Sequence, residues 1–408
     1  MSIEPVVPSR REANSGAPKG QVWSAEQSVL ARRNVSSGRR LRPLLILAAL
    51  VGIWCGYRAL SGGFVDLAVY RFGGIAVLDG PRLYAEGTPG TGLPFTYPPF
   101  SALAMVPLAV LPFALLVAVW NAASVVVLGL VVDRFLRVAR SVPVSPRLLA
   151  AVTAGALVIE PVWSSLAFGQ INIFLLALVA FDLLRSDRRH AGWMVGVAAG
   201  LKLTPLLFLV FLLLIGRFRA ARTGALAFLA TVGVGFVLVP GASWTYWTSL
   251  LWDAGRVGGV AYSGNQSVMG VLYRVTGHEP GTVVWFLIAG SLAGLTLLVA
   301  ALTWRRGRPE LAVCTAALAM LMASPISWSH HWVWAVPLVL VLWPVSRVVA
   351  VLATALFASS VIWVPPRTGM QELAWTPAEQ VYGNSYLIAA LLLAAYVGWI
   401  ALRRPASR

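Results

Sequence analysis

Apolar runs of membrane length alternate with short polar segments along most of this chain. The first run extends from Leu44 to Leu60 and ends without a small-residue cleavage pattern, so we expect a retained span and not a removed signal peptide. Later apolar runs predict spans near 148–166, 170–184, 223–240, 281–303, 310–324, 333–346, 347–364 and 385–402. The pattern predicts an all-α polytopic membrane protein.

Two stretches depart from this simple pattern. Residues 98–132 are apolar but interrupted by prolines, which predicts a kinked or re-entrant passage into the membrane. Residues 192–216 lie between two basic segments, and this requires either a hairpin of two short helices or a re-entrant loop, with Lys202 and Pro205 at its turn. With the hairpin counted as two, the pattern predicts about twelve crossings.

The pattern also divides the chain into a tail, one membrane domain and a short end. Residues 1–42 are rich in Ser, Gly, Pro and Arg without apolar periodicity, which is typical of a disordered basic tail. We expect a single transmembrane domain over 43–402 and a short tail over 403–408. Residues 61–97 form a long first outer loop, in which 66–78 is expected to lie as a short helix on the membrane surface.

Composition and charge agree with a membrane protein. Of the 408 residues, 58% are hydrophobic and 12% are charged. The formal charge of +17 would suggest a polyanion partner for a soluble protein, but here the arginines collect in short segments between apolar runs. By the positive-inside rule, these segments place both termini in the cytoplasm and the first loop outside the plasma membrane. We therefore expect contact with membrane lipids and no nucleic-acid partner.

Cysteines and histidines give little support for a metal site. Cys55 and Cys314 each lie inside an apolar run, where they are expected to pack. His330 and His331 follow the end of a span, but no partner His or Cys stands at ligand spacing. Adjacent histidines cannot both point the same way from a helix or strand, so we expect one to face a cavity. Interfacial histidines within a tryptophan belt are the other interpretation.

One carboxylate stands out in the first outer loop. Asp66 follows directly on the first apolar run, and its neighbours in the stretch 62–70 are mostly apolar. Such surroundings disfavour the charged carboxylate and raise its pKa, which suits a group that removes a proton. The competing interpretation is a solvated loop aspartate.

Two cations and two amides are further candidates. Lys202 and Arg256 lie away from the inner basic segments, and a cation at membrane depth needs a counter-ion such as a lipid phosphate. The alternatives are a snorkelling Lys202 and an Arg256 paired with Asp253. The side chains of Asn265 and Gln266 offer amide donors and acceptors suited to sugar hydroxyls or phosphate oxygens, although such a pair is also common in turns.

Seven motifs, in order within residues 60–345, resemble those of the actinobacterial family-87 glycosyltransferases of the GT-C superfamily. They resemble most closely the members that use polyprenol-phosphate-mannose to make α-1,2 linkages in phosphatidylinositol mannosides. The motifs are VDLAVY (65–70), LPFTYPPF (93–100), FGQIN (168–172), GLKLTP (200–205), DAGRVGG (253–259), GNQS (264–267) and SPISWSHHWVW (324–334).

The resemblance implies an inverting mannosyl transfer at the outer membrane face, from polyprenol-phosphate-mannose to a 2-hydroxyl of a phosphatidylinositol mannoside. Asp66 matches the family's aspartate in the first outer loop, the expected general base, and His330 matches a histidine of the same site. The other expected contacts are Lys202, Arg256, Asn265, Gln266 and His331 toward the donor, and Tyr97, Gln170 and Asn172 toward the acceptor. A lipid-phosphate donor needs no DxD metal motif, and we expect neither a metal nor a cofactor.

Two alternatives remain beside this expectation. A sister mannosyl- or arabinosyltransferase that branches lipomannan or lipoarabinomannan would share the same motifs. A lipid-sugar flippase or transporter would also need many spans and a polar cavity, but it predicts a pathway open to both sides and often an internal repeat. The polar residues here gather on one side and no repeat is visible, which favours an enzyme, expected as a monomer.

Overall fold

The computed structural model contains nearly the whole membrane domain. The residues it describes are 41–79, 82–140, 144–185 and 190–403. The tail predicted over 1–42 lies outside the described residues except for Leu41 and Arg42, and the tail predicted over 403–408 lies outside them except for Arg403.

Helices form all the regular structure of the described residues, apart from two isolated β-bridges, Gly87–Pro94 and Asn265–Trp328. Five helices are long and apolar enough to span a membrane. They are Leu41–Ser61, α5 (Phe113–Arg140), α11 (Phe218–Leu238), α14 (Thr282–Arg305) and α19 (Ser385–Leu402). The prediction of an all-α membrane protein is therefore confirmed.

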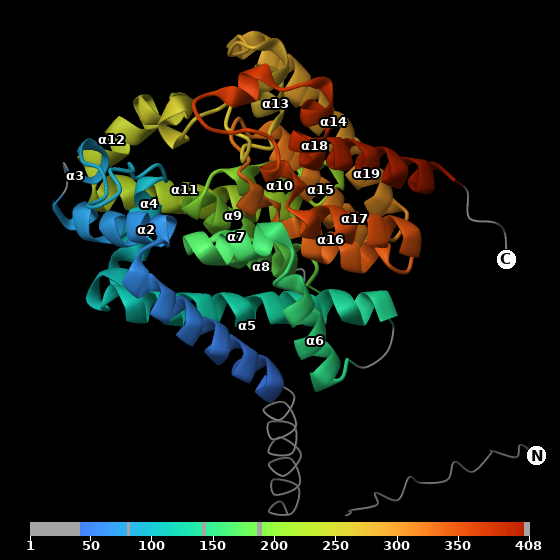
Figure 1. The fold of residues 1–408 in the computed structure, drawn as a ribbon, viewed down its shortest axis with the longest axis horizontal. Helices are drawn as coiled ribbons and strands as arrows, with labels where there is room; N and C mark the ends of the chain where they lie inside the picture. Colours follow the sequence, from blue (N-terminus) through green and yellow to red (C-terminus); the bar gives the residue numbers. More distant parts are fainter. Residues whose placement is uncertain (1–40, 80–81, 141–143, 186–189, 404–408) are drawn as a thin grey trace, which may run out of the picture.

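Shorter helices fill the space between these spans (Figure 1). Before α11 they are α2 (Val65–Ala76), η2 (Val77–Asp79), α3 (Arg82–Ala85), α4 (Pro99–Met105), η3 (Val106–Val110), α6 (Pro146–Ala156), α7 (Glu160–Phe168), α8 (Asn172–Leu183), α9 (Trp193–Leu201), η4 (Thr204–Leu206) and α10 (Leu207–Leu214). After it they are α12 (Pro240–Thr248), η5 (Leu250–Trp252), η6 (Ala254–Val257), α13 (Val268–Thr276), α15 (Pro309–Ala323), η7 (Ser329–Trp334), α16 (Ala335–Leu342), α17 (Arg347–Ser359), η8 (Val361–Trp363), η9 (Gln371–Ala374) and α18 (Pro377–Gly383).

The predicted kinks are present, and so is a helix in the stretch where a short helix was expected. Within 98–132 the chain forms α4 and η3, breaks at Pro112 and then continues as α5. A proline cannot donate to the preceding turn, so the run cannot continue as one straight helix. The helix expected over 66–78 is α2, which follows the first span.

The span predicted over 148–166 is sharply bent. The chain there forms α6 and α7, which meet at an angle of 79°. Pro161 stands in the first turn of α7. Its ring would clash with the carbonyl of Leu157, four residues earlier, so the helix must break between them.

Residues 192–216 form two short helical pieces, α9 and α10, with Lys202 at their junction as expected. Lys202 is extended, with φ −155° and ψ 128°, so it ends α9 and turns the chain. Helix α9 packs closely on α11, where a Cβ added at Gly196 would lie 2.2 Å from the carbonyl oxygen of Gly224. This close packing fixes the position of the Lys202 turn.

Candidate active site

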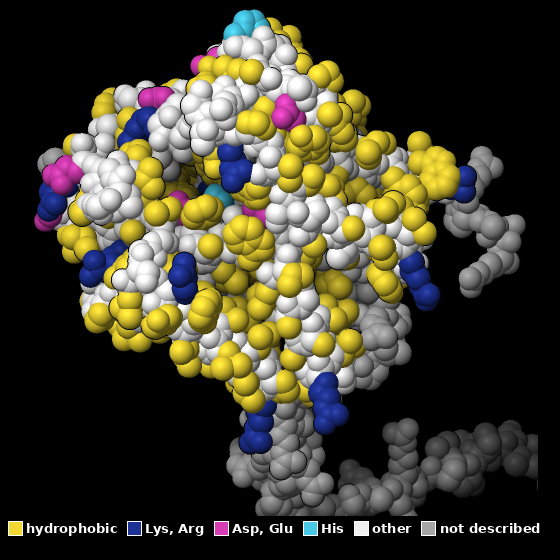
Figure 2. Space-filling model, viewed as in Figure 1, with side chains coloured by type: hydrophobic (Ala, Val, Ile, Leu, Met, Phe, Trp, Pro, Cys, Tyr) yellow, Lys and Arg dark blue, Asp and Glu magenta, His cyan; other side chains and the backbone are white. Residues whose placement is uncertain are grey.

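A cavity of about 500 Å³ opens among α2, the loop before α4, the Lys202 turn, the η5–η6 segment and the loop between α15 and η7. Figure 2 shows a hollow on one face of the molecule in which histidine and acidic side chains are visible. Seven of the ten predicted site residues line this cavity. They are Asp66, Tyr97, Gln170, Lys202, Arg256, His330 and His331.

The backbone places Asp66 in the first turn of α2. Gly62 and Gly63 take positive φ angles of 99° and 92°, which side chains rarely adopt, and they end the first span before α2 begins. The amide of Phe64 then donates to the carbonyl of Ala167 at 3.2 Å, which ties the start of α2 to α7. A carboxylate in the first helical turn is also favoured by the helix dipole.

The surroundings of Asp66 tune it as a base. Burial raises the pKa of Asp66 to about 6, because desolvation disfavours the carboxylate. The hydrogen bond with Gln170 and the charge of Lys202 act in the opposite direction and keep the pKa from rising further. Helix α2 is not among the membrane spans, so Asp66 lies at the end of the first span and not within it.

A hydrogen-bond network orients Gln170 toward Asp66. The hydroxyl of Tyr70 donates to Oε1 of Gln170 at 2.8 Å, and Nδ2 of Asn172 donates to the same oxygen at 3.2 Å. Since the carbonyl oxygen of Gln170 is taken by these donors, its amide nitrogen is left to donate to the carboxylate. The hydroxyls of Tyr70 and Tyr97 lie 3.1 Å apart, which extends the network to the cavity wall.

Lys202 joins this network to the histidines. Its Nζ donates to Oδ1 of Asn172 at 3.1 Å and lies 2.9 Å from Nε2 of His331. It also lies 5.6 Å from the ring centre of Tyr97, within reach of a cation–π contact. In the described residues Lys202 makes no ion pair within 4 Å, so its amino group can still approach an anionic ligand.

Both histidines line the cavity, which differs from the expectation that only one would face it. They lie in η7, where Trp332 departs from helical geometry, so the rule for a regular helix does not hold here. Their ring centres are 4.9 Å apart. The carbonyl of His330 accepts hydrogen bonds from Ser165 and Asn172 at 3.0 Å each. The side-chain Nε2 of His330 is buried and has no hydrogen-bond partner in the part of the chain that the structure describes.

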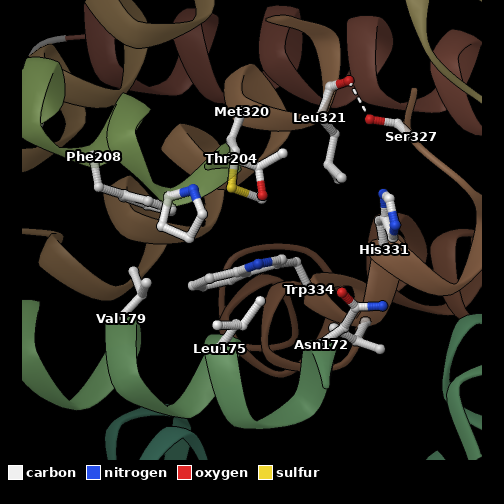
Figure 3. A pocket seen from close by; sticks show the side chains of 12 residues that line it. Asn172, Leu175, Val179, Thr204, Phe208, Met320, Leu321, Ser327, His331 and Trp334 are labelled. Atoms are coloured by element: carbon white, nitrogen blue, oxygen red, sulfur yellow. Dashed lines mark hydrogen bonds between the residues drawn. The ribbon is translucent and has the colours of Figure 1, made fainter. Parts of the chain in front are cut away.

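Asn172 is the one predicted acceptor contact outside the cavity wall. Figure 3 shows Asn172 and His331 on neighbouring elements, beside a small void of about 20 Å³ that they both line. The Asn172 amide bonds Gln170, the His330 carbonyl and Lys202. It therefore supports the groups that do face the cavity.

Arg256 is part of the cavity wall, in η6. Its guanidinium lies 6.0 Å from the ring centre of Tyr84. It forms no ion pair with Asp253 or any other acid of the described chain, so the alternative of a simple Arg–Asp pair is wrong.

Asn265 and Gln266 do not line the cavity, unlike the expectation from their motif. Both are fully buried. Asn265 bonds the carbonyls of Val260 and Pro325, and Gln266 bonds those of Ser263 and Gly383 at 2.7 Å each. Their amide groups are satisfied by backbone, and they hold the loop before α13 to the loop before η7 and to the end of α18.

Glu160 was not predicted as a site residue, yet its side chain supports η7, the segment that carries both histidines. Its carboxylate is fully buried and accepts from Ser329 at 2.9 Å, Trp363 at 3.1 Å and Tyr386 at 2.9 Å. Ser329 precedes His330, so Glu160 connects that histidine to α19. The three partners are 169 to 226 residues away in sequence, and no local pattern signals such a contact.

No three His, Cys, Asp or Glu side chains of the described residues come together as a metal site would require. What the cavity brings together is the buried carboxylate of Asp66, a lysine near it, an arginine that forms no ion pair in the described residues, and two histidines. This set suits the removal of a proton from a hydroxyl beside a bound anion.

Comparison with known proteins identifies the family. The family model described as glycosyltransferase family 87 matches residues 95–325. This match includes Gln170, Lys202 and Arg256, and it ends before the two histidines. No solved structure matches.

Three curated relatives match nearly the whole chain. A polyprenol-phosphate-mannose-dependent alpha-(1-2)-phosphatidylinositol pentamannoside mannosyltransferase of Mycobacterium tuberculosis is 35% identical, over 93% of this chain and 92% of its own length. The protein of the same description from Mycolicibacterium smegmatis is 34% identical, over 90% and 93%. A polyprenol-phosphate-mannose-dependent alpha-(1-2)-phosphatidylinositol mannoside mannosyltransferase of Mycobacterium tuberculosis is 36% identical, over 88% and 91%. With the family match over more than half of its residues, this chain belongs to glycosyltransferase family 87.

Proposed function

We propose that this enzyme transfers mannose from polyprenol-phosphate-mannose to the 2-hydroxyl of a mannose on a phosphatidylinositol mannoside. The observation that carries the proposal is the shared cavity of Asp66, Lys202 and the two histidines. The descriptions of the relatives support both substrates and the α-1,2 linkage. Membership of a glycosyltransferase family favours this reaction over the flippase or transporter alternative.

Asp66 is the general base of the proposed reaction. The 2-hydroxyl oxygen of the acceptor attacks the anomeric carbon of the donor from the face opposite the phosphate, and the bond from that carbon to the phosphate oxygen breaks. Asp66 takes the hydroxyl proton, and the lipid phosphate leaves with the bonding electrons. One displacement inverts the anomeric centre and converts a β-linked donor into an α-linked product.

Lys202 and Arg256 neutralise the departing phosphate. Both are cavity residues without an acidic partner in the described chain. Cations aimed at a group that gains charge during the reaction stabilise the transition state more than the ground state. We infer that they fulfil the role that a metal ion has in nucleotide-sugar enzymes, so that no metal or cofactor is required.

The unpartnered Nε2 of His330 is a further group for the substrates. A buried nitrogen without a hydrogen-bond partner costs free energy, and a sugar hydroxyl or phosphate oxygen would remove that cost. Tyr97 and Gln170 line the same wall and are proposed to contact the acceptor sugar.

We place this reaction at the outer face of the plasma membrane, with both termini in the cytoplasm and about twelve crossings in a monomer. By length, five helices of the described residues can span, or six if α6 and α7 form one bent span. The shorter apolar helices, such as α8 and α15, would then supply the remaining crossings as broken or paired segments.

Reconstitution of the full chain tests this function. Purified protein is mixed with polyprenol-phosphate-mannose and either a defined phosphatidylinositol mannoside or lipomannan, and the product linkage is determined. The expected product is an α-1,2-linked mannose on the phosphatidylinositol mannoside, with no product from GDP-mannose. Transfer to lipomannan alone would instead support the sister enzyme, and no transfer with any acceptor would overturn the proposal.

A further inference from the structure

A second pocket, of about 430 Å³, lies where α14 and α19 end and α15 begins. Three arginines, Arg306, Arg308 and Arg403, contribute to its wall, together with the aromatic side chains of Tyr396 and Trp399. We call this the basic pocket. Helices α14, α15 and α19 lie side by side around it (Figure 1).

The basic pocket and the active-site cavity lie at opposite ends of the same helices. Helix α15 begins at Pro309, next to Arg308 of the basic pocket, and ends at Ala323, which lines the active-site cavity. Its 15 residues extend over roughly 22 Å at 1.5 Å per residue. Helix α19 likewise begins beside Glu160 and ends at the basic pocket. The basic pocket therefore lies on the side of the molecule away from the active-site cavity.

No acidic group of the described residues balances the positive charge of the basic pocket. All three arginines are exposed, and none makes an ion pair with an acid of the described residues. No acidic side chain is part of the pocket wall described in the structure. The nearest acid along the chain, Glu310, pairs instead with Arg134 at 3.4 Å. The pocket is thus built to receive an anion.

Apolar surface continues directly from these cations. The Arg403 guanidinium stacks on Trp399, 3.5 Å from the ring centre. Trp399 and Leu402 are 49% and 69% exposed on the outside of α19, a helix long enough to span a membrane. A ligand seated here would have its anion among arginines and its apolar part against lipid-facing side chains, at the depth where tryptophan favours the membrane interface.

We propose that the basic pocket binds the phosphate headgroup of an anionic phospholipid, in the leaflet opposite the active-site cavity. Arginine binds phosphate oxygens with two parallel hydrogen bonds, and basic pockets between membrane helices recognise anionic headgroups. This site is independent of the sugar substrates, because none of its wall residues is shared with the active-site cavity. Free phosphate has the same anion chemistry, and the test separates the two.

The test measures lipid binding to the full chain in neutral detergent. Phosphatidylglycerol, phosphatidylcholine or inorganic phosphate is titrated, and bound ligand is counted by native mass spectrometry. The double variant Arg306→Gln/Arg308→Gln removes two cations of the pocket, and Arg219→Gln/Arg222→Gln removes two exposed cations of α11 outside it. Each basic residue near a membrane surface raises the affinity for an anionic lipid roughly fivefold. Because the pocket variant lacks two of them, it should bind phosphatidylglycerol about 30-fold more weakly than the parent chain.

The control variant should bind as the parent chain does. Equal affinity of parent and pocket variant, or equal binding of phosphatidylcholine and phosphatidylglycerol by the parent, would overturn the proposal. Inorganic phosphate that binds as tightly as phosphatidylglycerol would overturn the lipid assignment in favour of a free-phosphate site. If the double variant does not fold, Arg403→Gln alone should still weaken phosphatidylglycerol binding about fivefold.

Discussion

Nζ of Lys202 lies 2.9 Å from Nε2 of His331, so the cation at the hairpin turn is bonded directly to the histidine segment. An ammonium group can only donate, and the imidazole nitrogen must therefore accept. A charged Lys202 would therefore be paired with a neutral His331 that carries its proton on Nδ1. The same nitrogen of Lys202 also lies 3.1 Å from Oδ1 of Asn172.

Lys202→Met should weaken use of the lipid-phosphate donor. The substitution keeps the volume of the stem but removes the charge, and a charge-assisted hydrogen bond is worth about 1.5–3 kcal/mol, or roughly 10- to 150-fold. The measurement is kcat/KM for polyprenol-phosphate-mannose, with Arg222→Met on α11 as a control far from the cavity. Normal donor dependence in Lys202→Met would mean that other groups hold the phosphate.

Asp66→Asn should leave a folded but nearly inactive enzyme. The amide has a similar size but cannot take up a proton near neutral pH, and loss of a general base costs about 10²- to 10⁴-fold in rate. Asp66→Glu should fail as well, because one added methylene moves the carboxylate by more than the roughly 0.5 Å that a preorganised site tolerates. Turnover is compared with the thermal unfolding midpoint of each variant. Near-normal turnover of Asp66→Asn would remove Asp66 from the mechanism.

The activity should rise with pH through the pKa of Asp66, which is about 6. The general base works as the carboxylate, so kcat/KM should fall toward tenfold per pH unit below that value. The profile of kcat/KM for the acceptor is recorded at saturating donor between about pH 4.5 and 8, a range that includes the pKa of Asp66. A flat profile across pH 6 would contradict a base with this pKa.

Local patterns were enough to predict most of the long apolar helices and seven of the residues that line the cavity. The apolar run ending at Leu60 and the proline interruptions in 98–132 correspond to the observed first span and kinks. Asp66 and Lys202 were recognisable because each is an isolated charge beside apolar sequence. Such a charge needs a specific partner wherever the chain folds.

Long-range contacts could not be predicted in the same way. The motif containing Gln266 indicates polar chemistry, but whether its amide meets a sugar or the carbonyl of Gly383, 117 residues away, depends on tertiary packing. Glu160 gave no signal because its partners come from η7, η8 and α19. Both His330 and His331 line the cavity from η7, a short 3₁₀ segment whose position no periodicity rule anticipates.

Impermeant maleimide should label a cysteine at position 85 from outside the cell and should not label one at position 219. Ala85 is exposed in α3 after the first outer loop begins, and Arg219 is exposed at the start of α11 in a basic segment. The native cysteines, Cys55 and Cys314, are buried and give little background. Labelling is measured on intact cells and again after lysis. The reverse pattern would place the active-site cavity on the cytoplasmic side.

Gln266→Ala should lower stability and leave donor affinity nearly unchanged. The Gln266 side chain donates to Ser263 and Gly383 and accepts from the amide of Tyr386, so its removal leaves three buried backbone groups without these bonds. Each buried group left unpaired costs about 1–3 kcal/mol. Gln170→Ala is the matched variant, because Gln170 lines the cavity and should change kcat/KM more than the unfolding midpoint. A Gln266→Ala protein with a normal midpoint and a raised KM for the donor would show instead that this amide contacts the substrate, as its motif first suggested.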